Sequence, residues 1–120
     1  MGSGNINKRS IGTVKEECAV AYLESNNYQI IEKNFRTRYG EIDIIAMDGE
    51  CLVFVEVKFR SSVKYGYPEE AVDSFKQRKI INTALFYMNK RGILSEYPCR
   101  FDVITILNDQ INHTKNAFTC

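Results

Sequence analysis

Charged residues interrupt two segments that otherwise consist of strand-forming residues. Residues 39–46 read Tyr-Gly-Glu-Ile-Asp-Ile-Ile-Ala, and residues 53–58 read Val-Phe-Val-Glu-Val-Lys. Val, Ile and Phe favour strands, and an unpaired carboxylate that leaves water still costs several kcal/mol after relaxation. Asp43 and Glu56 therefore need a compensating cation, and that cation is the main indication of function.

The length and composition are those of a single globular domain. A chain of 120 residues can bury roughly two thirds of its unfolded surface in one core. A hydrophobic fraction of 44% and a charged fraction of 26% argue against disordered, collagen-like and membrane classes. The net charge is +1, so nucleic-acid binding would depend on a local basic patch.

The N-terminus and the cysteines favour a cytoplasmic protein with no membrane association. Residues 1–9 lack the apolar core of a signal peptide, so we expect a flexible leader followed by one domain over residues 10–120. The four cysteines include no Cys-x-x-Cys pair, which argues against a zinc site. Without a signal peptide, we expect reduced thiols.

Two helices are expected from local signals. Thr13 and Glu16 fit a capping box, which predicts a first helix beginning near residue 13. Residues 61–67 have loop character, and Pro68 suits the first turn of a second helix that runs to about residue 90. Helical spacing indicates buried stripes of Ala19, Tyr22 and Leu23 in the first helix and of Ile81, Ala84, Leu85 and Met88 in the second.

The strand pattern completes a mixed α/β domain in the order helix, three strands, helix, and one or two strands. Asp48 and Gly49 are typical of a two-residue hairpin turn. That turn sets Asp43 opposite Phe54 and leaves it diagonal to Glu56, on the same face, roughly 7–8 Å away. A one-residue shift would turn Asp43 to the other face. The predicted strands are 28–36, 41–46, 52–59, 99–107 and a short last strand within 110–118.

Two carboxylates at this separation can hold one hard cation, because Mg²⁺ prefers oxygen ligands. Lys58 lies about 6.6 Å beyond Glu56 on the same strand face and can offer its ammonium to a phosphate oxygen or to the attacking water. Asp43, Glu56 and Lys58 thus predict hydrolysis of phosphodiester bonds with Mg²⁺ or Mn²⁺. The alternative is a solvent-facing pair of acids on an ordinary hairpin, with Lys58 as an ion-pair partner or an edge-strand charge.

Asp43, twelve intervening residues and Glu56-Val57-Lys58 form a pattern that resembles the PD-(D/E)xK nuclease superfamily, with Ile42 in the place of the motif's Pro. The closer resemblance is to the YraN-like family of small proteins, which look like Holliday-junction resolvases of archaeal type. It extends from Gly12 to Phe118. The matching residues include Glu16, Tyr22-Leu23, Asn34-Phe35-Arg36, Gly40-Glu41-Ile42-Asp43, Phe54 to Lys58, Glu70-Ala71-Val72, Lys76-Gln77, Cys99 to Val103 and Asn116-Ala117-Phe118.

The resemblance implies a restriction-endonuclease-like core, with a mixed central β-sheet flanked by helices, and a metal-dependent endonuclease that acts on DNA, including branched DNA. It also implies that Glu16 completes the metal cluster, although the capping box alone explains Glu16. A homodimer would match symmetric cutting of two strands. Two alternatives share every residue: a nucleic-acid-binding module of the same fold without cleavage, and an RNA endonuclease.

Basic and aromatic residues around these segments are candidates for nucleic-acid contact. Tyr39, Tyr65 and Tyr67 can stack on bases or form a half-buried rim. Glu41 shares the strand face and is either part of the site or a rim charge. His113 is expected to be structural. The candidates for phosphate contact, for which a solvated surface is the alternative, are Arg36, Arg38, Arg60, Lys76 and Lys79.

Overall fold

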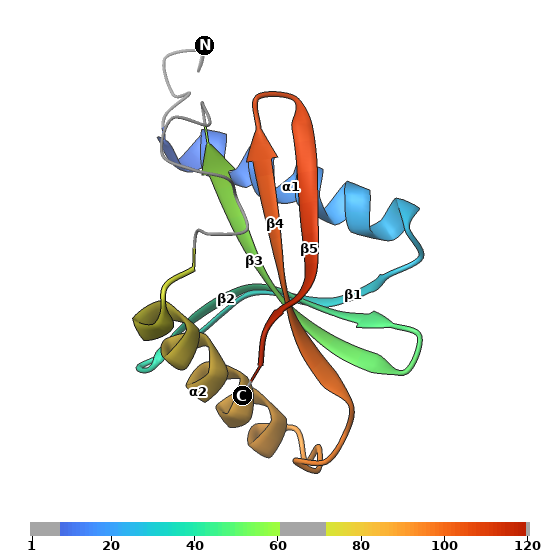
Figure 1. The fold of residues 1–120 in the computed structure, drawn as a ribbon, viewed down its shortest axis with the longest axis vertical. Helices are drawn as coiled ribbons and strands as arrows, with labels where there is room; N and C mark the ends of the chain where they lie inside the picture. Colours follow the sequence, from blue (N-terminus) through green and yellow to red (C-terminus); the bar gives the residue numbers. More distant parts are fainter. Residues whose placement is uncertain (1–7, 61–71, 120) are drawn as a thin grey trace.

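The computed structural model describes residues 8–60 and 72–119, which form a mixed α/β fold (Figure 1). The strands form one sheet in the order β1-β2-β3-β4-β5, in which β3 and β4 run parallel and the other neighbours antiparallel. This confirms the predicted architecture, which is compatible with a restriction-endonuclease-like core. The elements are α1 (Lys8–Ser25), β1 (Gln29–Thr37), β2 (Gly40–Asp48), β3 (Cys51–Arg60), α2 (Ser74–Lys90), β4 (Cys99–Leu107) and β5 (Gln110–Phe118).

The two helices cover opposite faces of the sheet, and in Figure 1 α1 passes behind β4 and β5. Each face therefore has a core of its own, because both faces of the central strands must be shielded from water. The α1-side core contains Ala19, Leu23, Tyr28, Ile44, Ala46, Val53, Val55, Ile104 and Ile106. The α2-side core contains Phe35, Ile42, Ile45, Leu52, Phe54, Ile80, Ala84, Tyr87, Met88, Phe101, Val103 and Phe118.

The start of α1 differs from the prediction. The helix begins at Lys8, so Thr13 lies inside it and the predicted capping box is wrong. No proline stands between Lys8 and Thr13, and one glycine such as Gly12 costs only about 1 kcal/mol inside a helix. The first seven residues of the expected leader lie outside the described residues. The expected stripe of α1 is confirmed by the burial of Ala19 and Leu23.

The start of α2 also differs. The helix begins at Ser74, where the Asp73 carboxylate accepts a hydrogen bond from the Lys76 backbone N–H at 2.8 Å, so Pro68 is not in its first turn. Residues 61–71, with the expected loop, Tyr65, Tyr67 and Pro68 itself, lie outside the described residues. Leu85 was expected in the core but is 47% exposed, because the buried stripe follows Ile80, Thr83, Ala84, Tyr87 and Met88.

The strands occur where the sequence predicts them, including a full-length β5, but the hairpin turn between β2 and β3 is shifted. Asp48 pairs with Cys51, so the loop residues are Gly49 and Glu50, and Gly49 takes the positive φ of 61° that favours glycine. The predicted pairing of Asp43 with Phe54 is wrong, because Phe54 pairs with Ile45. The register differs from the predicted one by two residues, and Asp43 lies just beyond the last pair, Ile44 with Val55.

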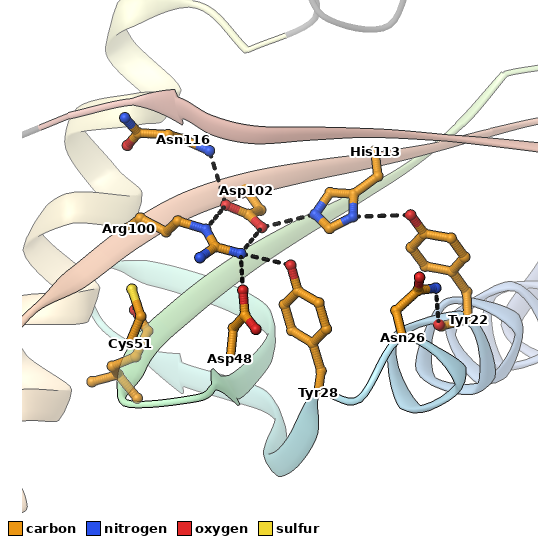
Figure 2. A network of polar contacts seen from close by, with 10 residues as sticks. Tyr22, Asn26, Tyr28, Asp48, Cys51, Arg100, Asp102, His113 and Asn116 are labelled. Carbon is orange, nitrogen blue, oxygen red and sulfur yellow. Dashed lines mark hydrogen bonds and ion pairs between the residues drawn. The ribbon is translucent and has the colours of Figure 1, made fainter.

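A buried polar network joins α1 to the far strands of the sheet (Figure 2). Its centre is Asp102 of β4, which is 0% exposed. Its carboxylate accepts hydrogen bonds from Arg100 Nε at 2.9 Å and from the Asn116 backbone N–H at 3.0 Å. It also lies 2.8 Å from His113 Nε2, and the other ring nitrogen of His113 lies 3.1 Å from the Tyr22 hydroxyl.

Arg100 extends this network to β2 and to Tyr28, the residue before β1. One guanidinium nitrogen, Nη2, lies 3.0 Å from Asp48 Oδ2 and donates to the Tyr28 hydroxyl at 2.6 Å. Burial raises the pKa of Tyr28 to about 12, so the hydroxyl stays protonated. The network holds α1, β2, β4 and β5 together, which agrees with the expected structural role of His113. None of the helices in the described part of the chain is long and apolar enough to cross a bilayer.

Candidate functional site

A cavity of about 160 Å³ lies between the start of β2, the middle of β3 and the first half of α2. Acidic and basic side chains face each other in it, which is unusual for a space beside a hydrophobic core. Asp43 and Glu56, the two acids that the sequence singled out, both line it. Among the described residues, the lining consists of Gly40, Glu41, Asp43, Glu56, Lys76, Lys79 and Ile80.

Asp43 lies where β2 and β3 separate. The paired residues of β2 and β3 end at Ile44 and Val55, whereas β3 pairs with β4 from Leu52 to Arg60. Beyond Val55, β3 therefore continues beside β4 while β2 diverges from it (Figure 1). Just beyond the last pair, the Asp43 carboxylate accepts a hydrogen bond from the Val57 backbone N–H at 2.8 Å. The carboxylate thereby satisfies a strand donor that has lost its neighbour, and this bond fixes its direction.

The backbone of β2 is irregular at the same point. Ile42 and Ile45 both pack in the α2-side core, whereas Ile44 packs in the α1-side core, so regular alternation fails between residues 42 and 45. On the neighbouring strand β1, Asn34 has a positive φ of 55° and lies between the two residues that pair with Ile44 and Ile42. The irregular segment therefore places Asp43 in the opening between the strands.

The surroundings of Asp43 disfavour the charge on its carboxylate. Glu56 is only 7% exposed. Burial, and then the negative charge of Glu56, raise the pKa of Asp43 to about 7, although the hydrogen bond from Val57 acts in the opposite direction. A nearby cation would favour the ionised form of Asp43. Asp43 therefore either keeps its proton or requires a cation nearby to be ionised.

One such cation comes from α2. Lys76 Nζ lies 3.3 Å from Glu56 Oε2, and the Lys76 side chain is 47% exposed while that of Glu56 is 8% exposed. The N-cap bond from Asp73 fixes the backbone at Lys76 in the first turn of α2. Lys76 was predicted as a phosphate contact, and that role stays a prediction. In this structure its ammonium neutralises the buried acid of β3.

The raised pKa of Asp43 predicts a pH dependence of stability. In the unfolded chain this carboxyl ionises near its ordinary pKa of about 4, whereas in the fold it keeps its proton up to about pH 7. Between these values the folded state binds more protons than the unfolded state, so the free energy of unfolding falls as the pH rises from 4 to 7 and then levels off. Asp43→Asn removes this loss and should stabilise the protein by roughly 2–4 kcal/mol at pH 8.

Denaturant unfolding of the wild type and of Asp43→Asn at pH 5 and pH 8, without divalent metal, measures the change in the free energy of unfolding. The gain from Asp43→Asn should be larger at pH 8 than at pH 5. Glu50→Gln in the exposed hairpin loop is the matched control and should leave the pH dependence as it is. An equal gain at both pH values would mean that the Asp43 carboxyl is ionised throughout.

Lys58 and Glu16 lie outside the lining of this cavity. Lys58 follows Glu56 on the same face of β3, is half-buried, and lies beside Thr105 of β4. Glu16 Oε1 accepts a hydrogen bond from the Asn34 amide at 2.9 Å, so Glu16 reaches the irregular part of β1 from α1. Neither residue lines the cavity. Their predicted catalytic roles, and the predicted metal ligation by Glu16, stay predictions.

The metal-ligand set is small. Across residues 8–60 and 72–119, no three His, Cys, Asp or Glu side chains converge closely enough to hold a metal ion by themselves. Asp43 and Glu56 are the two carboxylates in contact, and Glu41 lies at the rim, where its charge also raises the pKa of Asp43. One or two carboxylates are nevertheless the usual protein ligands of Mg²⁺ when substrate phosphates supply the rest.

The other predicted basic residues differ in their position relative to the cavity. Arg36 Nε lies 3.2 Å from Glu41 Oε2, and the Arg38 guanidinium lies 5.4 Å from the centre of the Tyr39 ring. Lys79 Nζ lies 4.8 Å from the centre of the Phe75 ring. Arg60, the last residue of β3, is half-buried. The structure thus brings Lys79 to the cavity and Arg36 to its rim, and places Arg38 in the adjoining β1–β2 turn.

Sequence reasoning missed two features of the site. The Val57 N–H is a backbone group and leaves no signal in the residue type. Asn34 has one signal, because asparagine is among the few residues that tolerate a positive φ, but only the structure shows that its amide bonds to Glu16.

Comparison with known proteins gives a consistent family. Residues 15–106 match the model of the uncharacterised protein family UPF0102. A UPF0102 protein of Persephonella marina is 53% identical over 107 residues, which cover 89% of this chain and 91% of the relative. One from Lachnoclostridium phytofermentans is 48% identical, covering 94% and 96%, and one from Geobacter sulfurreducens is 47% identical, covering 98% and 95%. These matches confirm the resemblance to the YraN-like family, and the chain belongs to the UPF0102 family.

Proposed function

We propose that this protein is a metal-dependent endonuclease that hydrolyses phosphodiester bonds of DNA, including branched DNA. The observation that supports it best is the meeting of Asp43 and Glu56, both largely buried, in one cavity beside an opened strand edge. A largely buried acid in a cavity whose pKa is raised by burial and by a neighbouring charge, as that of Asp43 is, is characteristic of functional sites. Lys58 on the same strand face supplies the third group of the nuclease-like pattern.

The residues of the cavity fit a divalent cation. Asp43 and Glu56 present oxygen ligands, as Mg²⁺ and Mn²⁺ prefer, and their negative charges are only partly balanced by Lys76. Asp43 and Glu56 would hold the ion, and Glu16 would join them directly or through water. When bound, such an ion stabilises charge on the phosphoryl oxygens and lowers the pKa of water.

The chain's own residues then position the substrate. Lys58 offers its ammonium to a phosphoryl oxygen or orients the attacking water. Lys79 at the cavity and Arg36 at its rim contact neighbouring phosphates. These contacts position the DNA strand in the site and are independent of the base sequence. The hydrogen bond from Val57 keeps the Asp43 carboxylate in place, so little reorganisation is needed when charge develops.

Metal binding and cleavage can be tested separately. Calorimetry with Mn²⁺ should show binding to the wild type and its loss in Asp43→Ala. Incubation with Mg²⁺ and a panel of linear, flap and four-way DNA, with an RNA strand as a further sample, then identifies the substrate. Metal binding that persists in Asp43→Ala, or cleavage that needs no divalent ion, would rule out this site.

A second function is favoured by Lys76. Because its ammonium already neutralises Glu56, the cavity can persist without a metal, as in a nucleic-acid-binding module that does not cleave. Such a module would bind DNA with a strong salt dependence and no metal dependence. DNA binding titrated in EDTA and in Mn²⁺ distinguishes the two functions, since only the nuclease should bind DNA more tightly with the metal.

The Lys76 ion pair predicts competition with the metal. Lys76→Met removes the cation that neutralises Glu56, so Mn²⁺ should bind roughly 3- to 30-fold more tightly, a gain in the range of one partly exposed ion pair. Calorimetry of the two proteins measures this change. Lys79→Met is the matched control, because Lys79 lines the same cavity with its ammonium over Phe75. Weaker Mn²⁺ binding by Lys76→Met than by Lys79→Met would contradict the competition.

A further inference from the structure

We infer that a strip of exposed aromatic and basic side chains beside the cavity binds unpaired nucleotides of single-stranded DNA. The inference rests on the proposed function for its choice of nucleic acid and goes beyond it by naming the form of the substrate. The strip consists of Tyr39 in the β1–β2 turn, Phe75 and Phe86 of α2, and the cations Arg38 and Lys79. It is called the aromatic strip below.

The rings of the aromatic strip are unusually accessible. Phe75 is 65% exposed, Phe86 43% and Tyr39 40%. The ring centres of Tyr39 and Phe86 lie 6.1 Å apart, so the turn and the helix form one surface. A large exposed apolar patch of this kind is typical of a binding site.

Cations accompany these rings. Lys79 Nζ lies 4.8 Å from the centre of the Phe75 ring, and the Arg38 guanidinium lies 5.4 Å from that of Tyr39. A strip that bound an apolar partner would gain nothing from cations on its rings. A nucleic acid needs both groups, because its bases stack on ring faces while its phosphates attract cations.

The aromatic strip is continuous with the cavity. Lys79 belongs to both, and Gly40, next to Tyr39, also lines the cavity. The turn lies so close to α2 that a Cβ on Gly40 would stand 3.2 Å from Thr83 Oγ1 and 3.5 Å from Lys79 Cβ. A DNA strand whose bases stack on the aromatic strip would therefore extend toward Asp43 and Glu56.

The chemistry favours unpaired over paired nucleotides. In a duplex both faces of each internal base are already stacked, so only an unpaired base can offer a face to Tyr39, Phe75 or Phe86. The rings belong to a turn and a helix surface, and stacking of this kind tolerates any base. The expected ligand is a single-stranded arm or gap, without sequence preference.

Fluorescence anisotropy tests this with a labelled oligodeoxythymidine on the order of ten nucleotides long and a duplex of equal length, in EDTA. The single strand should bind more tightly than the duplex. Tyr39→Ala and Phe75→Ala should each weaken its binding about 5- to 20-fold, somewhat below the upper range for stacked bases because the rings are exposed.

Matched controls lie at the other end of α2, where Leu94 and Tyr97 line a separate apolar cavity. The exposed fraction of Tyr97, 38%, is similar to that of Tyr39, and the exposed fraction of Leu94, 71%, is similar to that of Phe75. Tyr97→Ala and Leu94→Ala should bind the single strand as the wild type does. Tighter binding to the duplex, or equal losses in Tyr39→Ala and Tyr97→Ala, would overturn the inference.

This test is independent of the nuclease test. Binding is measured without divalent metal and without cleavage, so a protein that fails to cut DNA can still show the effect of Tyr39→Ala. Conversely, the Mn²⁺ titration of Asp43→Ala does not involve the aromatic strip. Failure of either result leaves the other standing.

Discussion

Replacing Asp43 with asparagine, or Lys58 with methionine, is expected to lower the rate of Mg²⁺-dependent DNA cleavage by at least about 100-fold. Asp43→Asn keeps the shape of the side chain and its acceptor for the Val57 N–H but removes the negative charge that would hold the proposed metal. Lys58→Met keeps the apolar stem and removes the ammonium that would contact the phosphate. Cleavage rates at saturating Mg²⁺ measure both losses.

The controls separate chemistry from folding. Asp43→Asn should be at least as stable as the wild type at pH 8, because the substitution removes a buried carboxyl, so its inactivity cannot be ascribed to unfolding. Asp109→Asn in the turn after β4 and Lys90→Met at the end of α2 change the same groups at exposed positions and should cleave normally. Comparable losses in these controls would show that the measured cleavage does not come from the cavity.

The largest loss of stability is expected from Asp102→Ala. This carboxylate is 0% exposed, and its removal leaves Arg100 and His113 without the partner they share. Breaking a buried ion pair by removing one partner costs about 3–5 kcal/mol. For a chain of this size, the melting temperature should fall by roughly 10–25 °C. Thermal unfolding followed by circular dichroism gives the value.

The same carboxylate predicts an acid sensitivity. Burial opposes ionisation of Asp102, but hydrogen bonds from His113, Arg100 and Asn116 outweigh it and hold the pKa below its ordinary value. Its contribution is therefore present above the ordinary pKa of about 4 and is lost as the pH falls below it. The Asp102→Ala loss should shrink in acid, whereas Asp109→Ala should change stability by less than about 0.5 kcal/mol throughout. A loss independent of pH would contradict the role of the ionised form.

The sequence predicted the strands well because their signals are local. Alternating β-branched residues and turn residues bound each strand, and the burial of Glu56 and its nearness to Asp43 followed from the pattern itself. The exact turn did not follow, because Gly49 can occupy either central position of a two-residue loop and the flanking pairs decide which. The predicted nearness of Asp43 to Glu56 holds despite this error, because the irregular part of β2 brings both side chains into one cavity.

The rest of the site depends on how distant segments dock. Lys76 reaches Glu56 only when α2 lies against the sheet, and nothing in either local sequence indicates this ion pair. The network around Asp102 is similar, since Tyr22 and His113 come from opposite ends of the chain. The starts of both helices were also misjudged, because capping signals are short and occur by chance inside helices and loops.

The parallel pairing of β3 with β4 bears on how the site assembles during folding. β1, β2 and β3 follow one another as hairpins and can form from nearby contacts, which close quickly. β4 can join only after the crossover through α2 has closed a much longer loop, at greater entropic cost. From this topology we expect the two acids to come together early and the lysine that neutralises one of them to dock when the crossover closes. A folding intermediate that lacks the crossover would expose an uncompensated acidic edge.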